Sequence, residues 1–464
     1  MADPRPPSRQ RTARPSSARR PSGPRTPPRA PDPRTADPRH LALRLLGLVL
    51  RRGQPLDEAL AGNRSVAALA ARDRAFLRLL LATTLRRLGQ LDAALDSLVQ
   101  RPLPAHPGEL RDLLRLGAAQ LLFLGTPPHA AVSTSLALAE GRTLRNFKGL
   151  INALLRRLAR EGAAILEGQD GARLNLPGWL WDSLVAAHGE AAARAIAAVQ
   201  AGEPPLDLTL KDGQDVELWA ERLEAEPLPT GSLRRPAAGG EIAALPGFAE
   251  GAWWVQDAAA ALPARLLGSV DGRAVADLCA APGGKTAQLA AAGARVVAVE
   301  ISRSRLARVG ENLRRLGLSA RLLEADATVW QPDEPLPFIL LDAPCSATGT
   351  LRRHPDVAWL KSPADLPALT ALQDCLLERA VAGLAPGGTL VYATCSLLPE
   401  EGPERIERLL AAGAPLARRP VRAEEVGGLA ELVTPQGDLR TLPCHLAERG
   451  GLDGFYACRL VRQA

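Results

Sequence analysis

The second half of the sequence alternates short apolar runs with longer helical stretches, and no other feature constrains the fold as strongly. The strand-like runs are 274–279, 296–300, 322–326, 338–342 and 389–395, and the helix-like stretches are 285–293, 302–316, 363–384 and 400–412. This alternation predicts a parallel sheet with helices on both faces, followed by a final strand at 455–461. Ligands of such sheets bind at the carboxyl ends of the strands, so the residues there are the candidates for chemistry.

The first half of the chain is organised differently. Residues 1–39 hold ten Arg and eleven Pro and almost nothing apolar, which predicts a disordered tail. Residues 40–163 carry apolar faces of helical period, and residues 164–256 are mixed, with a strand expected at 206–210. The chain is therefore expected to be multidomain, with an all-α domain, a small α+β linker domain and an α/β domain at 257–464.

The clearest helix closes the all-α segment. Its apolar residues recur at i, i+3 and i+4, at positions 147, 150, 151, 154, 155 and 158. Four basic residues lie opposite this stripe: Arg145, Lys148, Arg156 and Arg160. They form either a solvated helix face or a surface that contacts an RNA backbone.

Charge and cysteine content exclude several classes of protein. The net charge is +7, and the tail alone supplies it (ten Arg minus three Asp), so the basic balance is a weak sign of nucleic-acid binding by the folded part. The six cysteines include no C-x-x-C pair, so we expect no disulfide scaffold, no metal site and a cytoplasmic location. No apolar run approaches the ~18 residues of a membrane span, and no membrane association is expected.

The first strand of the α/β segment ends in a glycine-rich turn. The turn consists of Cys279, Ala280, Ala281, Pro282, Gly283, Gly284 and Lys285. A phosphate-binding loop would need Gly at position 279, and the dinucleotide pattern G-x-G-x-x-G is absent. A nucleoside ligand without a pyrophosphate, such as S-adenosylmethionine, remains. Lys285 either orients Asp277 or another nearby carboxylate, or is simply solvated.

Two further strands end in acidic residues. Glu300 ends the second strand and could accept hydrogen bonds from both ribose hydroxyls. Asp326 ends the third and could meet the adenine amino group. Together with the glycine turn, these acids predict a class I (Rossmann-like) methyltransferase domain.

The fourth and fifth strands end in Asp342-Ala343-Pro344-Cys345 and in Thr394-Cys395. Neighbouring strands thus bring an acid and two thiols to one rim, whereas Cys375, Cys444 and Cys458 are expected to be structural. A thiolate that adds to carbon 6 of cytosine makes carbon 5 nucleophilic enough to accept a methyl group, and an Asp near ring nitrogen 3 stabilises the adduct. These residue patterns alone leave open which thiol attacks.

Three long stretches carry a family resemblance: DLCAAPGGKT (277–286), LDAPCSATGTLRRHPD (341–356) and LVYATCSLLPEE (390–401). They resemble the bacterial Sun/Nop family of RNA cytosine-5 methyltransferases that act on small-subunit ribosomal RNA. PPHAA (127–131) and KGLINALLRRL (148–158) resemble the NusB-like RNA-binding domain found at the N-terminus of such enzymes. The likeness runs from about residue 40 to 464 and is least clear in 164–256.

The resemblance implies a role for each matching residue. Cys395 would be the nucleophile, Cys345 would assist product release, and Asp342 would contact both the cofactor and the target base. Residues 279–285, Glu300 and Asp326 would line the pocket for S-adenosylmethionine, although the family more often has Asp at position 300. The implied substrate is a cytidine of 16S ribosomal RNA, single-stranded or flipped out of its stack, and the protein is expected to be a monomer.

Further residues could grip the RNA. Arg352, Arg353 and His354 could hold phosphates, or could form an ordinary surface loop. Trp253, Trp254 and Tyr392 are the few aromatic candidates for base stacking near the site.

Two alternative functions remain open at this point. The same chemistry could act on transfer RNA or another RNA. The chain could also be a non-catalytic RNA-binding or antitermination factor, against which the intact cysteines, Asp342 and the glycine turn argue.

Overall fold

The computed structural model describes Met1 and residues 37–213, 215–236 and 241–464. The tail expected at 1–39 lies outside the described residues except for Met1 and residues 37–39. Residues 38 and 39 already belong to helix α1, because the Asp37 side chain accepts a hydrogen bond from the Arg39 backbone N–H (2.9 Å) and Pro38 suits the first helical position.

The N-terminal part is a bundle of helices, as the apolar spacing predicted. The helices are α1 (Pro38–Arg52), α2 (Leu56–Ala61), α3 (Arg64–Ala67), α4 (Ala71–Arg86), α5 (Leu88–Ser97), α6 (Gly108–Leu122), α7 (Pro128–Leu138) and α8 (Lys148–Glu167). Their leucine-rich faces form one core that includes Leu41, Leu77, Leu113 and Leu155, each 0% exposed. Helix α8 continues to Glu167, so the boundary expected at 163 falls inside a helix.

The linker combines helices with a small antiparallel sheet. Helices α9 (Gly171–Leu174), α10 (Gly178–His188) and α11 (Glu190–Gln200) precede a sheet whose strands lie in the order β2-β3-β1-β4. These strands are β1 (Leu206–Leu210), β2 (Glu226–Pro227), β3 (Leu233–Arg235) and β4 (Trp253–Val255), and α12 (Val216–Arg222) packs beside them. Strand β1 has the bounds that the alternation at 206–210 predicts.

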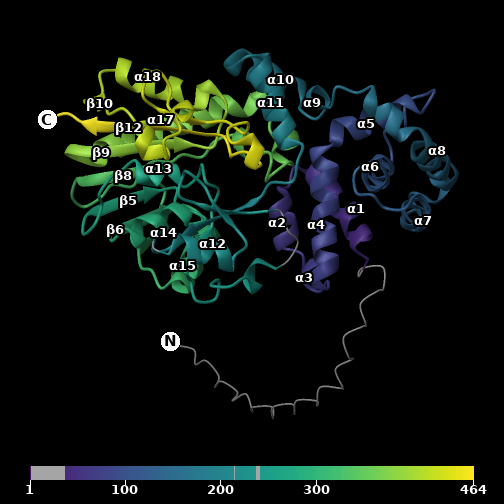
Figure 1. Ribbon diagram of the computed structural model, residues 1–464, viewed down its shortest axis with the longest axis horizontal. Coiled ribbons are helices and arrows are strands. Elements are labelled where there is room, and N and C mark those ends of the chain that lie inside the picture. The colour runs from purple at the N-terminus through teal and green to yellow at the C-terminus, as the bar shows by residue number, and fades with distance from the viewer. Residues whose placement is uncertain (2–36, 214, 237–240) are drawn as a thin grey trace, which may run out of the picture.

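The C-terminal domain is built on an eight-stranded sheet in the order β10-β12-β9-β8-β5-β6-β7, with β11 paired to β12 (Figure 1). Its strands are β5 (Ala274–Leu278), β6 (Arg295–Glu300), β7 (Arg321–Glu324), β8 (Leu336–Asp342), β9 (Leu384–Thr394), β10 (Leu416–Arg418), β11 (Leu439–Thr441) and β12 (Phe455–Arg462). Its main helices are α13 (Leu262–Arg265), α14 (Gly284–Ala291), α15 (Arg303–Leu316), α16 (Val357–Leu360), α17 (Leu366–Gly383) and α18 (Pro403–Ala411). Helices α14 and α15 cover one face, and α17 and α18 cover the other (Figure 1).

The sheet is mixed rather than fully parallel. Strands β5 to β9 are parallel, whereas β12 runs antiparallel to β9, and β10 and β11 run antiparallel to β12. The register places Tyr456 opposite Thr394 and Val461 opposite Thr389, so β12 starts beside the end of β9 and must return in the opposite direction. The predicted parallel sheet is thus confirmed for β5 to β9, and the edge that follows β9 adds antiparallel strands whose direction the sequence did not predict.

The helical domain packs directly on the segment that follows β8. The Trp359 indole N–H donates to the Leu85 carbonyl (2.9 Å), and the Leu56 backbone N–H donates to a buried carboxylate oxygen of Asp356 (2.9 Å). Trp359 and Leu360 also pack against the leucine core of the helical bundle. The segment that carries Cys345 is thus held between two domains.

Candidate active site

The site lies where the strand order reverses, between the carboxyl ends of β5 and β8. Strand β5 ends at Leu278, Cys279 takes a left-handed conformation (φ 61°), and Gly283 (φ 101°) caps helix α14. A side-chain Cβ at Gly283 would come within 3.0 Å of Val309, so glycine suits both the conformation and the close packing of this turn.

A cavity of about 450 Å³ opens above the turn. Residues expected to contact the cofactor or the substrate line it: Ala280, Ala281, Pro282, Gly283, Gly284, Lys285, Asp342, His354, Arg353 and Cys395. Lys285 reaches across the switch point and donates to Asp342 Oδ2 (2.7 Å), the nearby carboxylate that was one of its two expected partners. Cys279, Cys345, Glu300 and Asp326 are not among the described residues that line this cavity.

The buried carboxylate of Asp277 lines the base of this cavity. The Thr286 hydroxyl donates to Asp277 Oδ2 (2.6 Å), whereas Oδ1 is buried without a hydrogen-bond partner. Burial, and then the charge of Asp342, raise the pKa of the Asp277 carboxyl to about 7. A buried acceptor without a partner fits a ligand that carries a donor group, such as the ammonium of S-adenosylmethionine.

Of the other two acidic strand ends, Glu300 contacts the turn and Asp326 lies at the end of the edge strand β7. Glu300 is 2% exposed, and its carboxylate accepts hydrogen bonds from the Ser302 N–H (3.0 Å) and the Ala281 N–H (3.4 Å). Asp326 is partly exposed after β7, where its Oδ1 accepts from the Thr328 N–H and hydroxyl (2.9 and 2.7 Å). Glu300 therefore holds the turn itself in place, and the cofactor contacts expected of both acids remain predictions.

The two thiols of the neighbouring strands are in contact. The Sγ atoms of Cys345 and Cys395 lie 3.4 Å apart. Parallel pairing of β8 with β9 sets this distance, and the Ala343 N–H donates to the Ala393 carbonyl (2.8 Å) just beyond the last residue pair. Cys395 lines the cavity, so an acid, an ammonium group and a thiol converge on one space.

The surroundings of Cys345 favour its protonated form. The hydrogen bond with Cys395, then burial, then the nearby charge of Glu401 raise the pKa of the Cys345 thiol well above its usual value. Cys345 therefore keeps its proton at neutral pH. Burial likewise raises the pKa of Cys279 to about 12, which makes that thiol unreactive.

Arg352 does not hold RNA phosphates, nor does it lie on a surface loop. Its side chain is 1% exposed, donates through Nε to Asp453 Oδ1 (2.7 Å), and forms an ion pair with Asp257. Arg353 pairs with Asp257 as well (2.6 Å) but still reaches the cavity. His354 stays nearly half exposed beside Asp57 of the helical domain.

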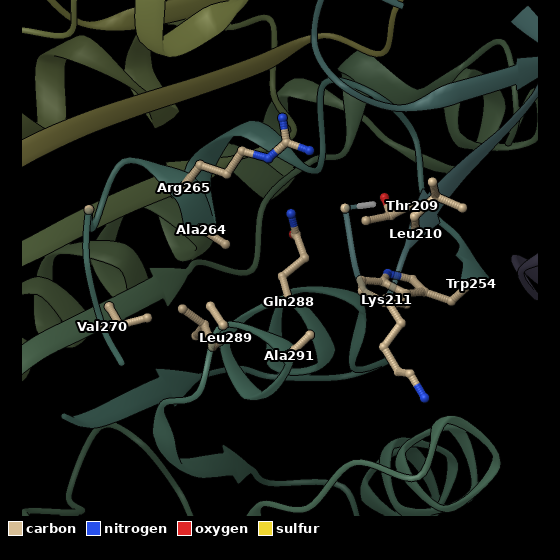
Figure 2. A pocket seen from close by; sticks show the side chains of 13 residues that line it. Thr209, Leu210, Lys211, Trp254, Ala264, Arg265, Val270, Gln288, Leu289 and Ala291 are labelled. Atoms are coloured by element: carbon tan, nitrogen blue, oxygen red, sulfur yellow. The ribbon is translucent and has the colours of Figure 1, made fainter. Parts of the chain in front are cut away.

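The aromatic candidates for base stacking are also buried. Trp253 and Tyr392 are both 0% exposed, and their polar atoms donate to the carbonyls of Pro246 and Glu401 (2.8 Å each). Trp254 is 5% exposed and forms a wall shared by the site cavity and a neighbouring cavity of about 400 Å³ (Figure 2). Its indole N–H donates to Gln256 (2.8 Å), so none of the three is a free stacking platform.

The remaining cysteines and the basic helix face lie away from the cavity. Cys458 is buried in β12 and Cys444 is partly buried, whereas Cys375 is exposed on α17 rather than packed in the core. On the helical domain, Arg145, Arg156 and Arg160 are exposed and Lys148 lies 3.7 Å from Glu140. Contact of this face with RNA remains a prediction.

Sequence reasoning missed the buried carboxylates behind the site. Asp257 and Asp453 line the cavity and bind the two arginines, and Glu401 lies beneath the thiol pair. Their only signal in the sequence was position, since Asp257 begins the domain and Glu401 ends the stretch LVYATCSLLPEE. Their partners are distant in the chain and could not be identified from a local pattern.

A doubly wound sheet with a glycine turn at its switch point and acidic residues at the ends of the following strands has the features of a class I methyltransferase. The family model described as 16S rRNA methyltransferase RsmB/F matches residues 264–461, and the NusB family model matches residues 36–160. Ribosomal RNA small subunit methyltransferase B of Pseudomonas putida is 39% identical over 444 residues, which is 92% of this chain and 99% of the relative. The chain belongs to the ribosomal RNA small subunit methyltransferase B family and is an S-adenosylmethionine-dependent RNA methyltransferase.

Other comparisons agree with this assignment. The Salmonella typhi protein of the same name is 38% identical over 443 residues, covering 92% of this chain and 98% of the relative. Among solved structures, PH0851 has a TM-score of 0.71 at 22% identity and covers 91% of this chain and 98% of its own. NSun6 from Pyrococcus horikoshii with SFG has a TM-score of 0.53 at 18% identity, with 62% and 98% coverage. The matches confirm the expected N-terminal helical domain and the expected C-terminal methyltransferase domain.

Proposed function

We propose that this chain methylates carbon 5 of a cytidine in 16S ribosomal RNA through a transient bond between the Cys395 sulfur and ring carbon 6. The observation that carries the proposal is the pair of sulfurs 3.4 Å apart, with Cys395 on the wall of a cavity that also holds Asp342. The names of the relatives support ribosomal RNA as the substrate.

The residues present suit S-adenosylmethionine. Gly283 and Gly284 let a nucleoside approach the backbone, and the unpartnered Oδ1 of Asp277 can accept a hydrogen bond from an ammonium group. When bound, this cofactor supplies an electrophilic methyl group. Glu300 and Asp326 are proposed to hold its ribose and adenine.

The protein residues carry the covalent chemistry. The Cys395 thiol releases its proton and its sulfur bonds to carbon 6. The electron pair of the 5,6 double bond then forms a 4,5 double bond, and the pair of the bond between carbon 4 and nitrogen 3 moves to nitrogen 3, which takes up the proton that the thiol released. Asp342 lies 2.7 Å from the Lys285 ammonium, which holds it ready to accept a hydrogen bond from the protonated nitrogen. Carbon 5 would then take the methyl group as its bond to the cofactor sulfur breaks, and S-adenosylhomocysteine would be the leaving group.

Release reverses the addition. The proton on carbon 5 leaves to a base, its electron pair restores the 5,6 double bond, and the carbon–sulfur bond breaks to return Cys395 and the ring to their starting protonation. Cys345 touches the Cys395 sulfur and is proposed to assist this half of the reaction. A cytidine inside a duplex cannot reach the thiol, so the base must be unstacked first.

Cys395→Ala and Cys345→Ala test the proposal in opposite ways. Cys395→Ala should abolish methylation of 16S ribosomal RNA and leave binding of S-adenosylhomocysteine, measured by calorimetry, unchanged. Cys345→Ala should instead accumulate a covalent protein–RNA adduct that a denaturing gel resolves. Activity of both variants with free turnover would contradict the proposal.

Bisulfite sequencing identifies the product in cells. Ribosomal RNA from cells that lack this chain should lose one 5-methylcytidine, and the wild-type chain, but not Cys395→Ala, should restore it. An unchanged 16S pattern with a lost methyl group in transfer RNA would favour the alternative RNA substrate. The cytoplasmic location and the monomeric state expected from the sequence remain predictions; within the described residues, no helix is both long and apolar enough to cross a membrane.

A further inference from the structure

Glu401 lies buried beneath the two thiols, at the end of the turn after β9. It is 0% exposed, and its carboxylate accepts four hydrogen bonds. Oε1 accepts from the Ser346 backbone N–H (2.8 Å) and the Gln373 amide (3.1 Å), and Oε2 accepts from the hydroxyls of Ser346 and Ser396 (2.6 Å for Ser396). A carboxylate that only accepts hydrogen bonds has the pattern of the ionised form.

Such a group is expensive to bury. Among the described residues, no Lys, Arg or His side chain forms an ion pair with Glu401, so hydrogen bonds alone compensate its charge. An unpaired buried charge costs several kcal/mol, and a neutral or apolar side chain would fill the same space more cheaply if packing were its only role. The position therefore points to a requirement beyond core filling.

The partners of Glu401 identify that requirement. Ser346 directly follows Cys345, and Ser396 directly follows Cys395, so one carboxylate links the two strand ends that carry the sulfurs. Thr348 closes the same cluster, with its hydroxyl 3.2 Å from the Ser396 hydroxyl. The Glu401 carbonyl further accepts hydrogen bonds from the side chains of Tyr392 and Thr394 on β9.

We propose that Glu401 is a positioning residue that holds Cys345 against Cys395, so that release of the RNA follows addition without delay. The inference rests on the proposed function, since it assigns a role to the spacing of the two thiols. The negative charge acts in the same direction as the geometry, because contact with Cys395, burial and Glu401 together raise the pKa of Cys345 and keep its proton in place.

Glu401→Ala tests the proposal by removing the link while leaving both cysteines. The variant should accumulate a covalent protein–RNA adduct, the result also expected of Cys345→Ala, and its turnover should fall by about 100-fold, the effect of a misplacement of about 1 Å at a reacting centre. Glu401→Gln should recover much of the turnover, because its amide oxygen can face the Ser346 N–H and its NH₂ group can donate to the serine hydroxyls. Glu404→Ala, at an exposed position of α18, is the matched control and should behave as wild type.

The amount of covalent adduct distinguishes a positioning role of Glu401 from a role in stability alone, because a merely destabilised enzyme would not accumulate adduct. Wild-type turnover of Glu401→Ala would overturn the proposal, as would a slow variant that shows no more adduct than wild type. If Glu401→Ala does not fold, the double variant Ser346→Ala, Ser396→Ala replaces it in the test. This variant removes the hydroxyl contacts with Glu401 and should also accumulate adduct. Wild-type turnover of the double variant without adduct would overturn the proposal. Methylation by Cys395→Ala would refute the proposed function itself, which is a distinct result.

Discussion

Arg352→Met should destabilise the methyltransferase domain strongly, although the sequence pattern suggested a role in phosphate binding. The guanidinium is 1% exposed and makes three sets of contacts, with Asp453 Oδ1 (2.7 Å), Asp257 and the Gly450 carbonyl (2.8 Å). Methionine has a similar length but cannot donate a hydrogen bond. The substitution leaves two carboxylates, 3% and 5% exposed, with Arg353 as their remaining cation.

The size of the effect follows from this burial. Removing one partner of a buried ion pair costs roughly 3–5 kcal/mol, and the lower end applies because Arg353 still pairs with Asp257. Loss of an exposed phosphate-binding arginine would instead change stability by less than about 0.5 kcal/mol and reduce the salt dependence of RNA binding. The two interpretations of Arg352 therefore predict opposite outcomes in two measurements.

The assay is chemical denaturation of the full chain followed by tryptophan fluorescence, together with RNA binding at several salt concentrations. Because the chain has several domains, the shift in the midpoint of the methyltransferase transition is compared rather than one free energy. Arg303→Met, at a side chain that is 89% exposed, is the control and should leave the midpoint unchanged. A wild-type midpoint with weakened RNA binding for Arg352→Met would refute the reasoning.

The pH dependence gives a second check on Arg352. Burial, then the charge of Asp257, raise the pKa of Asp453 to about 6, and losing Arg352 should raise it further. A protonated Asp453 no longer needs a cation, so the deficit of Arg352→Met should be largest above the raised pKa and shrink as the pH falls through it. Asp453→Asn in the same background should recover part of the midpoint at neutral pH, because it removes the charge of a buried group that has lost its closer cation and keeps only the 3.4 Å ion pair with Arg353.

Two further predictions concern the cofactor cavity and the thiol loop. Because the pKa of Asp277 is raised to about 7, its carboxyl loses its proton as the pH rises through 7, and affinity for S-adenosylhomocysteine, measured by calorimetry, should increase there. The ligand-free protein should lose stability as the pH rises from the ordinary pKa of an Asp carboxyl to this raised pKa. Asp277→Asn should abolish both pH trends. Gly349→Ala should lower the free energy of unfolding by about 1–3 kcal/mol and slow adduct formation. The Cβ of the alanine would lie 2.0 Å from the Gly454 carbonyl oxygen and 2.8 Å from the Cys395 carbonyl oxygen. Gly141→Ala, where the Cβ meets no atom within 4 Å, is the control and should leave stability unchanged in the same denaturation assay.

Much of the fold could be predicted because its signals are local. Strand β1 at 206–210, the apolar stripe of α8 and the glycine turn before α14 each depend on residues within a few positions of one another. The carboxyl ends of successive parallel strands must also meet at one edge, which is why Asp342 and the two cysteines could be assigned to one rim without coordinates.

Only the tertiary structure decided which side chains face the cavity and which are buried behind it. Arg352 meets Asp257 across 95 positions of the chain, and the Leu56 N–H meets Asp356 across 300, and no local pattern encodes such pairs. The same limit hid the burial of Tyr392 and the link from Glu401 to both cysteine loops. Periodicity and turn chemistry are properties of neighbouring residues, whereas burial and ion pairing depend on elements that meet only when the sheet, the linker and the helical domain pack together.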